Sequence, residues 1–353
     1  MITQKKNHRW KQLLIMLVTL SLLPFFPLKG FADTESELNF FVTPILPESQ
    51  LEGGASGYFD LNLGAGQVDS LGLNLQNSSD QDIVIEITAH TASTNVNGVV
   101  EYGKDAPDPD PTLPASLDEL IETPNEITLS GNERRTIELP LTMPEEEFNG
   151  VLAGGIRVRE VKADEEQTEE GEGVAITNAF SYVIGVVVSN SRSVTEPDLE
   201  LLDVFADQLN YRNVFSAQIQ NFTPTFVNKM EVEATVRAEG ESDILYEAKQ
   251  TGMQMAPNSH FNFPVSLEGD RFRSGTYVMD ITARSEGQEW TWGKVFTVEA
   301  DDARRLNRED VTIVDGTNWW VIAAISTIFV LGSVLFYVLY KQKKGTPNEG
   351  LKE

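Results

Sequence analysis

The stretch 73-LNLQNSSDQDIVIEIT-88 decides the fold, because its pattern returns in the second half of the chain as 217-AQIQNFTPTFVNKMEVEAT-235. Each copy reads as a strand with alternating apolar and polar residues, then Gln-Asn, a polar turn and a second alternating strand. A period of two is typical of a strand that buries one face and exposes the other. The two copies therefore predict that one β-unit is built twice.

A second pair of stretches extends the repeat. Residues 129–150, LSGNERRTIELPLTMPEEEFNG, match residues 255–275, MAPNSHFNFPVSLEGDRFRSG. Each has a turn, an alternating strand that contains a proline, an acidic loop and a glycine that opens the next strand. In the second half that strand, TYVMDITA, turns at RSEGQE into a last one, WTWGKVFTVEA. By analogy, the first half should run through VLAGGIRVREV, turn, and finish with AFSYVIGVVVS.

The repeat sets the expected domain limits. Residues 162–173, KADEEQTEEGEG, have the composition of an interdomain linker, but the analogy makes them an extended hairpin loop inside domain one. The boundary is then expected at residues 190–198, where Pro197 interrupts strand character. We therefore predict an all-β protein with two tandem immunoglobulin-like β-sandwich domains, at residues 33–192 and 197–300.

Domain one should carry an insert between its strands. Residues 102–114, YGKDAPDPDPTLP, are rich in Pro and Asp and are expected to form a loop. The SLDELIE that follows contains the capping-box pair Ser116 and Glu119, which predicts a short helix. The DAPDPDP run could offer carboxylates to Ca²⁺, but it lacks the Gly and the closing Glu of a calcium loop, so we assign no metal to it.

The N-terminus has the pattern of a secretory signal peptide. An apolar run at residues 13–23 follows a basic region made of Lys5, Lys6, Arg9 and Lys11. Small residues then offer a cleavage site after Ala32. An N-terminal membrane helix is the alternative, but the apolar run is short for a comfortable span. We expect residues 1–32 to be a signal peptide removed on export.

An apolar segment near the C-terminus has the length of a membrane span. Residues 319–340 contain no charge, and a helix of this length extends for about 33 Å, which matches the hydrocarbon core. Four aromatic residues fit the two interfacial belts: Trp319, Trp320, Tyr337 and Tyr340. Three lysines then follow that the positive-inside rule keeps in the cytoplasm: Lys341, Lys343 and Lys344.

These two segments predict a single-pass protein of the cell membrane with its ectodomain outside. A juxtamembrane linker is expected at residues 301–317, the transmembrane helix at 318–340 and a cytoplasmic tail at 341–353. The chain has no cysteine, so its domains must be stable without disulfides, and an N-terminal lipid-modified cysteine is excluded. Anchoring therefore falls to the C-terminal span.

The chain is strongly acidic, with a formal net charge of −27. Basic residues flank both apolar segments, so the acidity lies in the ectodomain. Such a surface repels phosphate backbones, which makes nucleic acid and anionic wall polymers poor partners, whereas cations or basic proteins fit. Solubility alone explains the charge equally well.

Residues for catalysis are scarce. Of three histidines, His8 lies in the signal peptide, which leaves His90 and His260, one in each predicted domain. A two-histidine zinc spacing within one domain is therefore impossible, and a thiol nucleophile is excluded. The chain has no G-x-S-x-G, S-x-x-K, P-loop or G-x-G-x-x-G pattern. We predict a protein that is not an enzyme and has no catalytic residue, cofactor or metal.

Aromatic residues are the remaining binding candidates. Trp290 and Trp292 could stack on a sugar or anchor an interface, but they share a face with Phe296 and Val298, which favours a place in the core. At the other end of the ectodomain, 39-NFFVTPILPESQ-50 contains Pro44 and Pro47, which forbid a helix interior and a central strand. We expect an edge strand that packs three apolar side chains against domain one: Phe41, Ile45 and Leu46.

Several of these stretches together resemble the WxL-interacting protein family of Gram-positive cell surfaces. The resemblance covers about residues 38–340 and rests on NFFVTPILPESQ followed by YFDL, on LNLQNSSDQDIVIEITAHTASTNVNGVVEY, on ITLSGNERRTIELPLTMPEEEFNGVLAGGI, on YVIGVVV, on MAPNSHFNFPV and on WTWGKVFTV. It implies a peptidoglycan-binding domain followed by a host-binding domain, acting beside secreted proteins with Trp-x-Leu motifs. It fixes no binding residues.

The resemblance favours a non-enzymatic, membrane-anchored scaffold that binds peptidoglycan and WxL-type surface proteins and links them to the cell envelope. An exposed sandwich edge could add a partner strand. The alternative is an adhesin whose second domain binds host extracellular matrix, although a membrane-proximal domain would have to reach through the wall. A wall hydrolase is the third reading.

Overall fold

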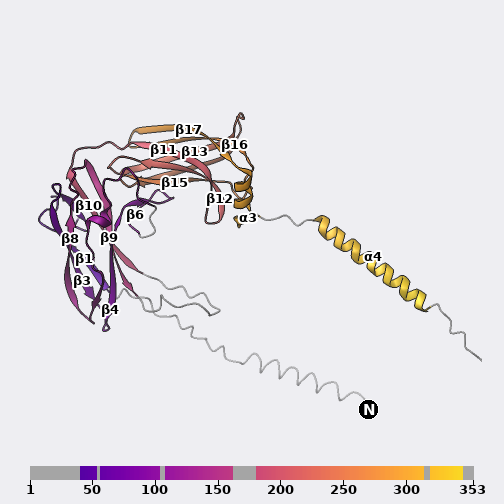
Figure 1. Ribbon diagram of the computed structural model, residues 1–353, viewed down its shortest axis with the longest axis horizontal. Coiled ribbons are helices and arrows are strands. Elements are labelled where there is room, and N and C mark those ends of the chain that lie inside the picture. Colours follow the sequence, from indigo (N-terminus) through magenta and orange to yellow (C-terminus); the bar gives the residue numbers. More distant parts are fainter. Residues whose placement is uncertain (1–39, 54–55, 104–107, 162–179, 314–318, 345–353) are drawn as a thin grey trace, which may run out of the picture. The chain divides into compact units, whose positions relative to one another are not determined.

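The computed structural model describes residues 40–53, 56–103, 108–161, 180–313 and 319–344. Strands dominate these residues and form two β-sandwiches, one from each half of the repeat (Figure 1). The all-β prediction is confirmed. The expected signal peptide at residues 1–32 and the acidic segment at 162–173 lie outside the described residues.

The first sandwich packs a three-stranded sheet against a five-stranded sheet. The three-stranded sheet has the order β1-β3-β8, with β1 (Phe40–Ile45), β3 (Val68–Asn77) and β8 (Arg134–Thr142). The five-stranded sheet has the order β2-β10-β9-β4-β7, with β2 (Phe59–Asn62), β10 (Ser181–Ser191), β9 (Gly150–Val161), β4 (Ile83–Thr91) and β7 (Asn125–Leu129). The short strands β5 (Ser93–Thr94) and β6 (Val100–Glu101) pair with each other.

The second sandwich has three strands facing four. One sheet has the order β11-β12-β15, with β11 (Leu199–Leu209), β12 (Arg212–Asn221) and β15 (Ser259–Ser266). The other has the order β14-β13-β16-β17, with β14 (Ile244–Met255), β13 (Val227–Ala238), β16 (Gly275–Ser285) and β17 (Gln288–Val298).

The sheet orders reproduce the sequence repeat strand by strand. The order β1-β3-β8 corresponds to β11-β12-β15, and β7-β4-β9-β10 corresponds to β14-β13-β16-β17. The first sandwich adds β2, which pairs in parallel with β10. The strands β9 and β10 pair antiparallel, as the analogy with β16 and β17 predicts.

Alternation builds the two cores. In β3 and β4 the alternating apolar residues point inward and are buried: Leu71, Leu73, Leu75, Ile83, Ile85 and Ile87. The second core is richer in phenylalanine and methionine, with Phe215, Phe263, Met230, Met255 and Met279 among its buried members. Burying such side chains contributes about 1.5–3 kcal/mol each, which is how a chain without disulfides holds two domains.

A buried asparagine closes one end of the first sandwich. The Asn77 side chain is 1 % exposed, and its Nδ2 donates to the carbonyl oxygens of Gln81 at 2.7 Å, Ser130 at 2.9 Å and Leu129 at 3.2 Å. Its Oδ1 accepts from the amide of Ser79 at 2.9 Å and from the hydroxyl at 2.8 Å. The β3–β4 and β7–β8 connections both cross between sheets here, so one side chain ties the two crossings together.

Asn221 occupies the same place in the second sandwich. Its Nδ2 donates to the carbonyl oxygens of Thr225 at 2.7 Å and Ala256 at 2.8 Å, and its Oδ1 accepts from the Thr223 hydroxyl at 2.6 Å. The side chain is fully buried. The asparagine of the repeated Gln-Asn pair is therefore a structural clamp that both halves of the chain share.

The first strand is an edge strand, as predicted, but its inward face was assigned wrongly. Phe40 and Val42 are buried, whereas Phe41 is 47 % and Ile45 is 44 % exposed. Register with β3 sets the phase of the alternation, and the Ile45 side chain instead lies beside Gly72, where a Cβ would come within 2.9 Å of it. Of the three residues expected to pack, only Leu46 contacts the core.

The predicted short helix is present as α2 (Leu117–Leu120), without the capping box. The Ser116 side chain makes no capping hydrogen bond. The Leu117 amide donates instead to the Thr91 hydroxyl at 2.7 Å, so a residue at the end of β4 satisfies the helix terminus.

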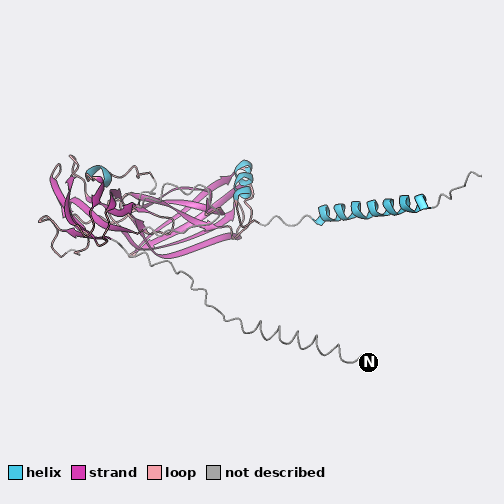
Figure 2. Cartoon of the chain, turned by 90° about the horizontal axis from the view of Figure 1, so that it is seen from below, coloured by secondary structure: helices cyan, strands magenta, loops and turns pink. Residues whose placement is uncertain are grey.

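Two helices follow the second sandwich (Figure 2). Residues expected to form a linker contain α3 (Ala300–Glu309), which buries Ala303 and Leu306 in the second core. The apolar segment forms α4 (Trp319–Lys344). Among the described helices, one stretch, Ile322–Lys341, is long and apolar enough to cross a membrane.

Replacing Asn77 by Ala should lower the free energy of unfolding by about 2–4 kcal/mol, because several buried backbone groups lose their partner at once. Urea unfolding of the purified protein, followed by far-UV circular dichroism, measures the change, because the first sandwich contains no tryptophan. Asn74→Ala is the matched control, since Asn74 is exposed on the same strand, and should change stability by no more than about 0.5 kcal/mol. Equal effects of the two variants would contradict the clamp.

Candidate functional site

The two tryptophans proposed from the sequence lie on the core side of β17. Trp290 and Trp292 are half-buried and pack against the second core. The Trp290 Nε1 donates to Asp198 Oδ1 at 2.8 Å, so its polar atom has a partner within the domain. Both side chains are positioned as structural residues.

The two histidines lie at the junction of the sandwiches. His90 and His260 line one cavity of about 180 Å³, together with the Asp-rich insert. The His90 Nε2 lies 2.8 Å from the Thr88 hydroxyl, and the His260 Nδ1 lies 2.8 Å from Asp110 Oδ2. Burial lowers the pKa of His90, with a further contribution from Arg157. Among the described residues, no three His, Cys, Asp or Glu side chains are grouped to hold a metal ion.

Asp110 is the centre of this junction. It belongs to the Pro- and Asp-rich insert of the first half, yet it is 5 % exposed and accepts from Gln220 Nε2 at 2.8 and 2.9 Å. Thr112 adds an amide at 2.9 Å and a hydroxyl at 2.6 Å. Its oxygens are therefore occupied by protein donors, and the calcium reading of the insert finds no support in this residue.

Further contacts join the same surfaces. The hydroxyls of Thr94 and Ser259 lie 2.7 Å apart, and the Asn258 Nδ2 donates to the Thr112 carbonyl at 3.0 Å. A small apolar cluster of Ala92, Ala153 and Ala256 lies beside them. The insert thus serves as a polar and apolar joint between the two sandwiches.

The hydrogen bonds at this joint control the charge of Asp110. Burial raises the pKa of the Asp110 carboxyl, but the hydrogen bonds from Thr112, Gln220 and His260 lower it by more. The net pKa lies below the ordinary value, so Asp110 is ionised at neutral pH.

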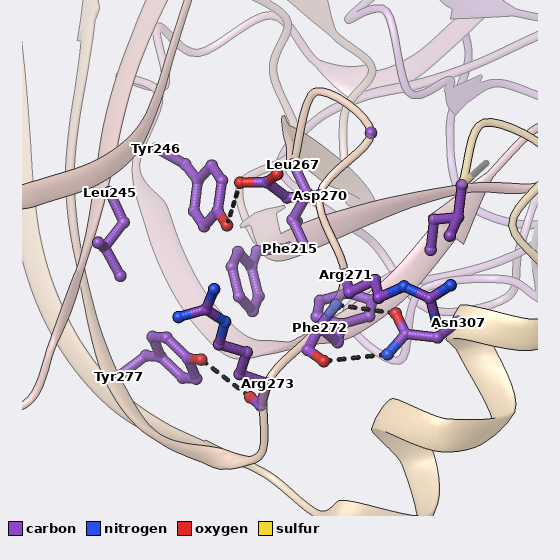
Figure 3. Close-up of a pocket in the computed structure, with 12 residues that line it drawn as sticks. Phe215, Leu245, Tyr246, Leu267, Asp270, Arg271, Phe272, Arg273, Tyr277 and Asn307 are labelled. Carbon is purple, nitrogen blue, oxygen red and sulfur yellow. Dashed lines mark hydrogen bonds between the residues drawn. The ribbon is translucent and has the colours of Figure 1, made fainter. Parts of the chain in front are cut away.

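A further pocket lies in the second sandwich, at the end where α3 packs. It has a volume of about 690 Å³, and Figure 3 shows how side chains from β12, β14, β16, α3 and the β15–β16 loop surround it. Aromatic and apolar walls come from Phe215, Tyr246, Phe272, Tyr277 and Leu245. Polar groups come from Asp270, Arg271, Arg273 and Asn307.

Hydrogen bonds fix the walls of this pocket. The Tyr246 hydroxyl donates to Asp270 Oδ2 at 3.2 Å, and the Tyr277 hydroxyl donates to the Arg273 carbonyl at 2.9 Å (Figure 3). Asn307 of α3 accepts from the Phe272 amide at 2.8 Å and donates back to its carbonyl at 3.0 Å. Burial, with the nearby Asp270 carboxylate, raises the pKa of Tyr246 to about 12, so its hydroxyl stays a donor at physiological pH.

The anchor residues predicted from the sequence are placed on α4. Trp320, Tyr337, Tyr340 and Lys341 are exposed on this helix. Trp319, Lys343 and Lys344 lie within the same helix. The predicted cleavage residue Ala32 lies outside the described residues.

The pocket was not predicted from the sequence. Its residues come from β12, β14, the β15–β16 loop and α3, and no local motif connects them. The one available signal was the pair of arginines in DRFRSG within an acidic chain.

Two family models match the chain in tandem. Residues 40–160 match "WxL Interacting Protein, peptidoglycan binding domain", and residues 171–308 match "WxL Interacting Protein, host binding domain". The second match begins before β10, a strand that pairs with β9 and β2 in the first sandwich. A comparison with curated proteins finds no relative that matches the chain.

Among solved structures, the chain is similar to chaperones of fimbrial assembly. A chaperone–tip subunit complex of the Csu pili of Acinetobacter baumannii is 13 % identical, with 72 % of this chain and 98 % of that chain covered and a TM-score of 0.32. The Salmonella enterica SafA pilin in complex with the SafB chaperone is 12 % identical, with 75 % and 99 % covered and a TM-score of 0.27. These scores are too low to support an argument about function.

The Asp110 joint predicts a pH dependence of stability. Because the pKa of Asp110 is lower in the folded state than in the unfolded state, its stabilising contribution is present above the unfolded pKa. The contribution is lost as the pH falls from about 5 through the folded pKa. Asp110→Asn should therefore cost about 1–3 kcal/mol at pH 7, and less at pH 3.5.

Urea unfolding of both proteins at the two pH values measures this difference. Asp118→Asn is the control, because Asp118 lines the same small cavity but is exposed. A constant deficit of Asp110→Asn at both pH values would show that the ionised carboxylate does not stabilise the joint.

Proposed function

The chain belongs to the WxL-interacting protein family, and from this premise we propose that it is a membrane-anchored scaffold which binds peptidoglycan and WxL-type surface proteins. The tandem order of the two family matches carries this proposal, since it pairs a peptidoglycan-binding domain with a second binding domain in one chain. The chain is thus a surface binding protein, and the scaffold role is the specific function we infer for it.

Peptidoglycan binding is assigned to the first sandwich. The family match covers residues 40–160, and β10 completes the same five-stranded sheet between β9 and β2. We therefore propose that the peptidoglycan-binding unit runs to about residue 192 and includes β10. The second sandwich, starting at about residue 197, is the second binding unit.

Anchoring is assigned to α4. Its span Ile322–Lys341 is apolar and none of it is buried against the sandwiches. Lysines at its C-terminal end favour a cytoplasmic C-terminus, which leaves both sandwiches outside the cell. A protein held in this way would sit between membrane and wall.

An adhesin is the second candidate function. The match of residues 171–308 to a host-binding domain favours it, and most of the residues that line the 690 Å³ pocket lie within this range. Both matched families are binding domains, so the wall-hydrolase reading ranks last.

Purified full-length protein in detergent should cosediment with purified Gram-positive peptidoglycan in a saturable way, and digestion of the wall by muramidase should return it to the supernatant. Binding should persist at 500 mM NaCl, because an acidic surface does not drive it by charge. More of an added WxL-domain protein should sediment with the peptidoglycan when this protein is present than when it is absent. Sedimentation no greater than that of an unrelated acidic protein would refute the scaffold function.

A further inference from the structure

The pocket of the second sandwich continues into a groove along β14. A second cavity of about 500 Å³ shares Leu245, Tyr246, Leu267 and Asp270 with the pocket and extends it toward Glu247 and Glu268. The groove therefore runs between the first residues of β14 and the end of β15, over several residues of an extended chain.

The floor of the groove is a rigid aromatic cluster. The Phe215 ring is 1 % exposed, and its centroid lies 5.2 Å from Phe272, 5.4 Å from Tyr277 and 5.9 Å from Tyr246. Phe215, Phe272 and Tyr277 are themselves buried, so this cluster supports the accessible apolar lining of the groove, which comes from Leu245 and the half-buried Tyr246. This lining offers a surface for an apolar or aromatic side chain.

The Arg273 guanidinium supplies a positive charge in the groove. The Asp270 carboxylate accepts from Tyr246, and the Arg273 side chain folds back among the rings of Phe215, Tyr246 and Tyr277 (Figure 3). Within the described part of the chain, the Arg273 guanidinium forms no ion pair, although the formal net charge of the protein is −27. An arginine fork without a carboxylate partner, over an apolar floor, suits the carboxylate of a ligand.

The edge of the sheet supplies the main-chain partner. Strand β14 is the outermost strand of its sheet, and its first residues are open to solvent, with Ile244 56 % and Leu245 48 % exposed. An edge strand can pair with an extended peptide through its free N–H and C=O groups. The groove thus combines a strand edge, an aromatic floor and a cation.

We propose that this groove binds an extended peptide of a partner protein, in which an apolar or aromatic side chain and a carboxylate are two residues apart. In an extended peptide, residues i and i+2 point to the same side, so one side chain reaches the apolar lining at Leu245 and Tyr246 while the other reaches Arg273. This inference rests on the proposed role of the second sandwich as a binding unit and names the chemistry it recognises.

The acidic rim narrows the choice of ligand. Glu247, Glu268 and Asp270 line the same groove, so a polyanion such as a phosphate-bearing wall polymer is repelled. A peptide with a single carboxylate next to neutral or basic residues avoids this repulsion. The groove therefore selects one carboxylate in an apolar context rather than negative charge in general.

The test uses full-length protein in lipid nanodiscs and fluorescein-labelled, end-capped hexapeptides read out by fluorescence anisotropy. The probes are Thr-Val-Phe-Thr-Asp-Thr, variants in which the flanking Thr and Val are exchanged for other β-formers, and the same series with Asn in place of Asp. The Asp peptides should bind about tenfold more tightly than the Asn peptides, and Arg273→Ala should remove this preference.

Arg237→Ala is the matched control, because Arg237 pairs with Asp280 on the same domain and lines neither cavity of the groove, and this variant should keep the preference for Asp. Arg273 is exposed, so its variant should unfold at the same urea concentration as the parent. Equal affinity for Asp and Asn peptides, no binding by any peptide of the series, or competition by inorganic phosphate alone would overturn the proposal. Wall sedimentation by the same protein would meanwhile leave the peptidoglycan function standing.

Discussion

Each sandwich depends on one buried asparagine that satisfies the backbone where the chain crosses between sheets. Asn77 and Asn221 each donate to carbonyls on two separate crossings and accept from the turn that follows them. The position requires two N–H donors and one acceptor on a short side chain. An aspartate would place a carboxylate oxygen against the backbone carbonyl oxygens, and a glutamine would be too long. Because the crossings define which strands face each other, this constraint underlies both cores.

Much of the fold could be predicted because it obeys a local rule. Period-two alternation placed the inward faces of β3, β4 and β13 correctly, and the repeat gave the pairing of β9 with β10. The edge elements escaped this rule. Strand β14 is exposed over much of its length, and the inward side of its alternation is only half-buried. Helix α3 reaches the core with only Ala303 and Leu306. The phase of β1 depended on its register with β3, which its own sequence does not contain.

The candidate site escaped prediction for a different reason. Arg273 and Tyr246 belong to no sequence motif. They line one pocket only because Phe215, which is distant along the chain, packs beneath them. Asp110 was predicted only to lie in a loop, because nothing near it in sequence reveals that Gln220 and His260 come from the other half to bury it. Both the pocket and the Asp110 contacts are formed by segments that are distant along the chain, and the alternation of apolar residues does not predict such contacts.

The direction of the strands in the second sandwich has a mechanical consequence. The chain enters this domain at Leu199, opposite Asn221, and leaves it at the far end, where Asp310 behind α3 accepts from the Asn213 amide at 2.7 Å. In a protein held by the wall at one end and by the membrane at the other, tension would therefore run along β11 and β17. The hydrogen bonds of the β11–β12 and β16–β17 ladders would be loaded in shear. They would therefore bear the force together rather than break one after another.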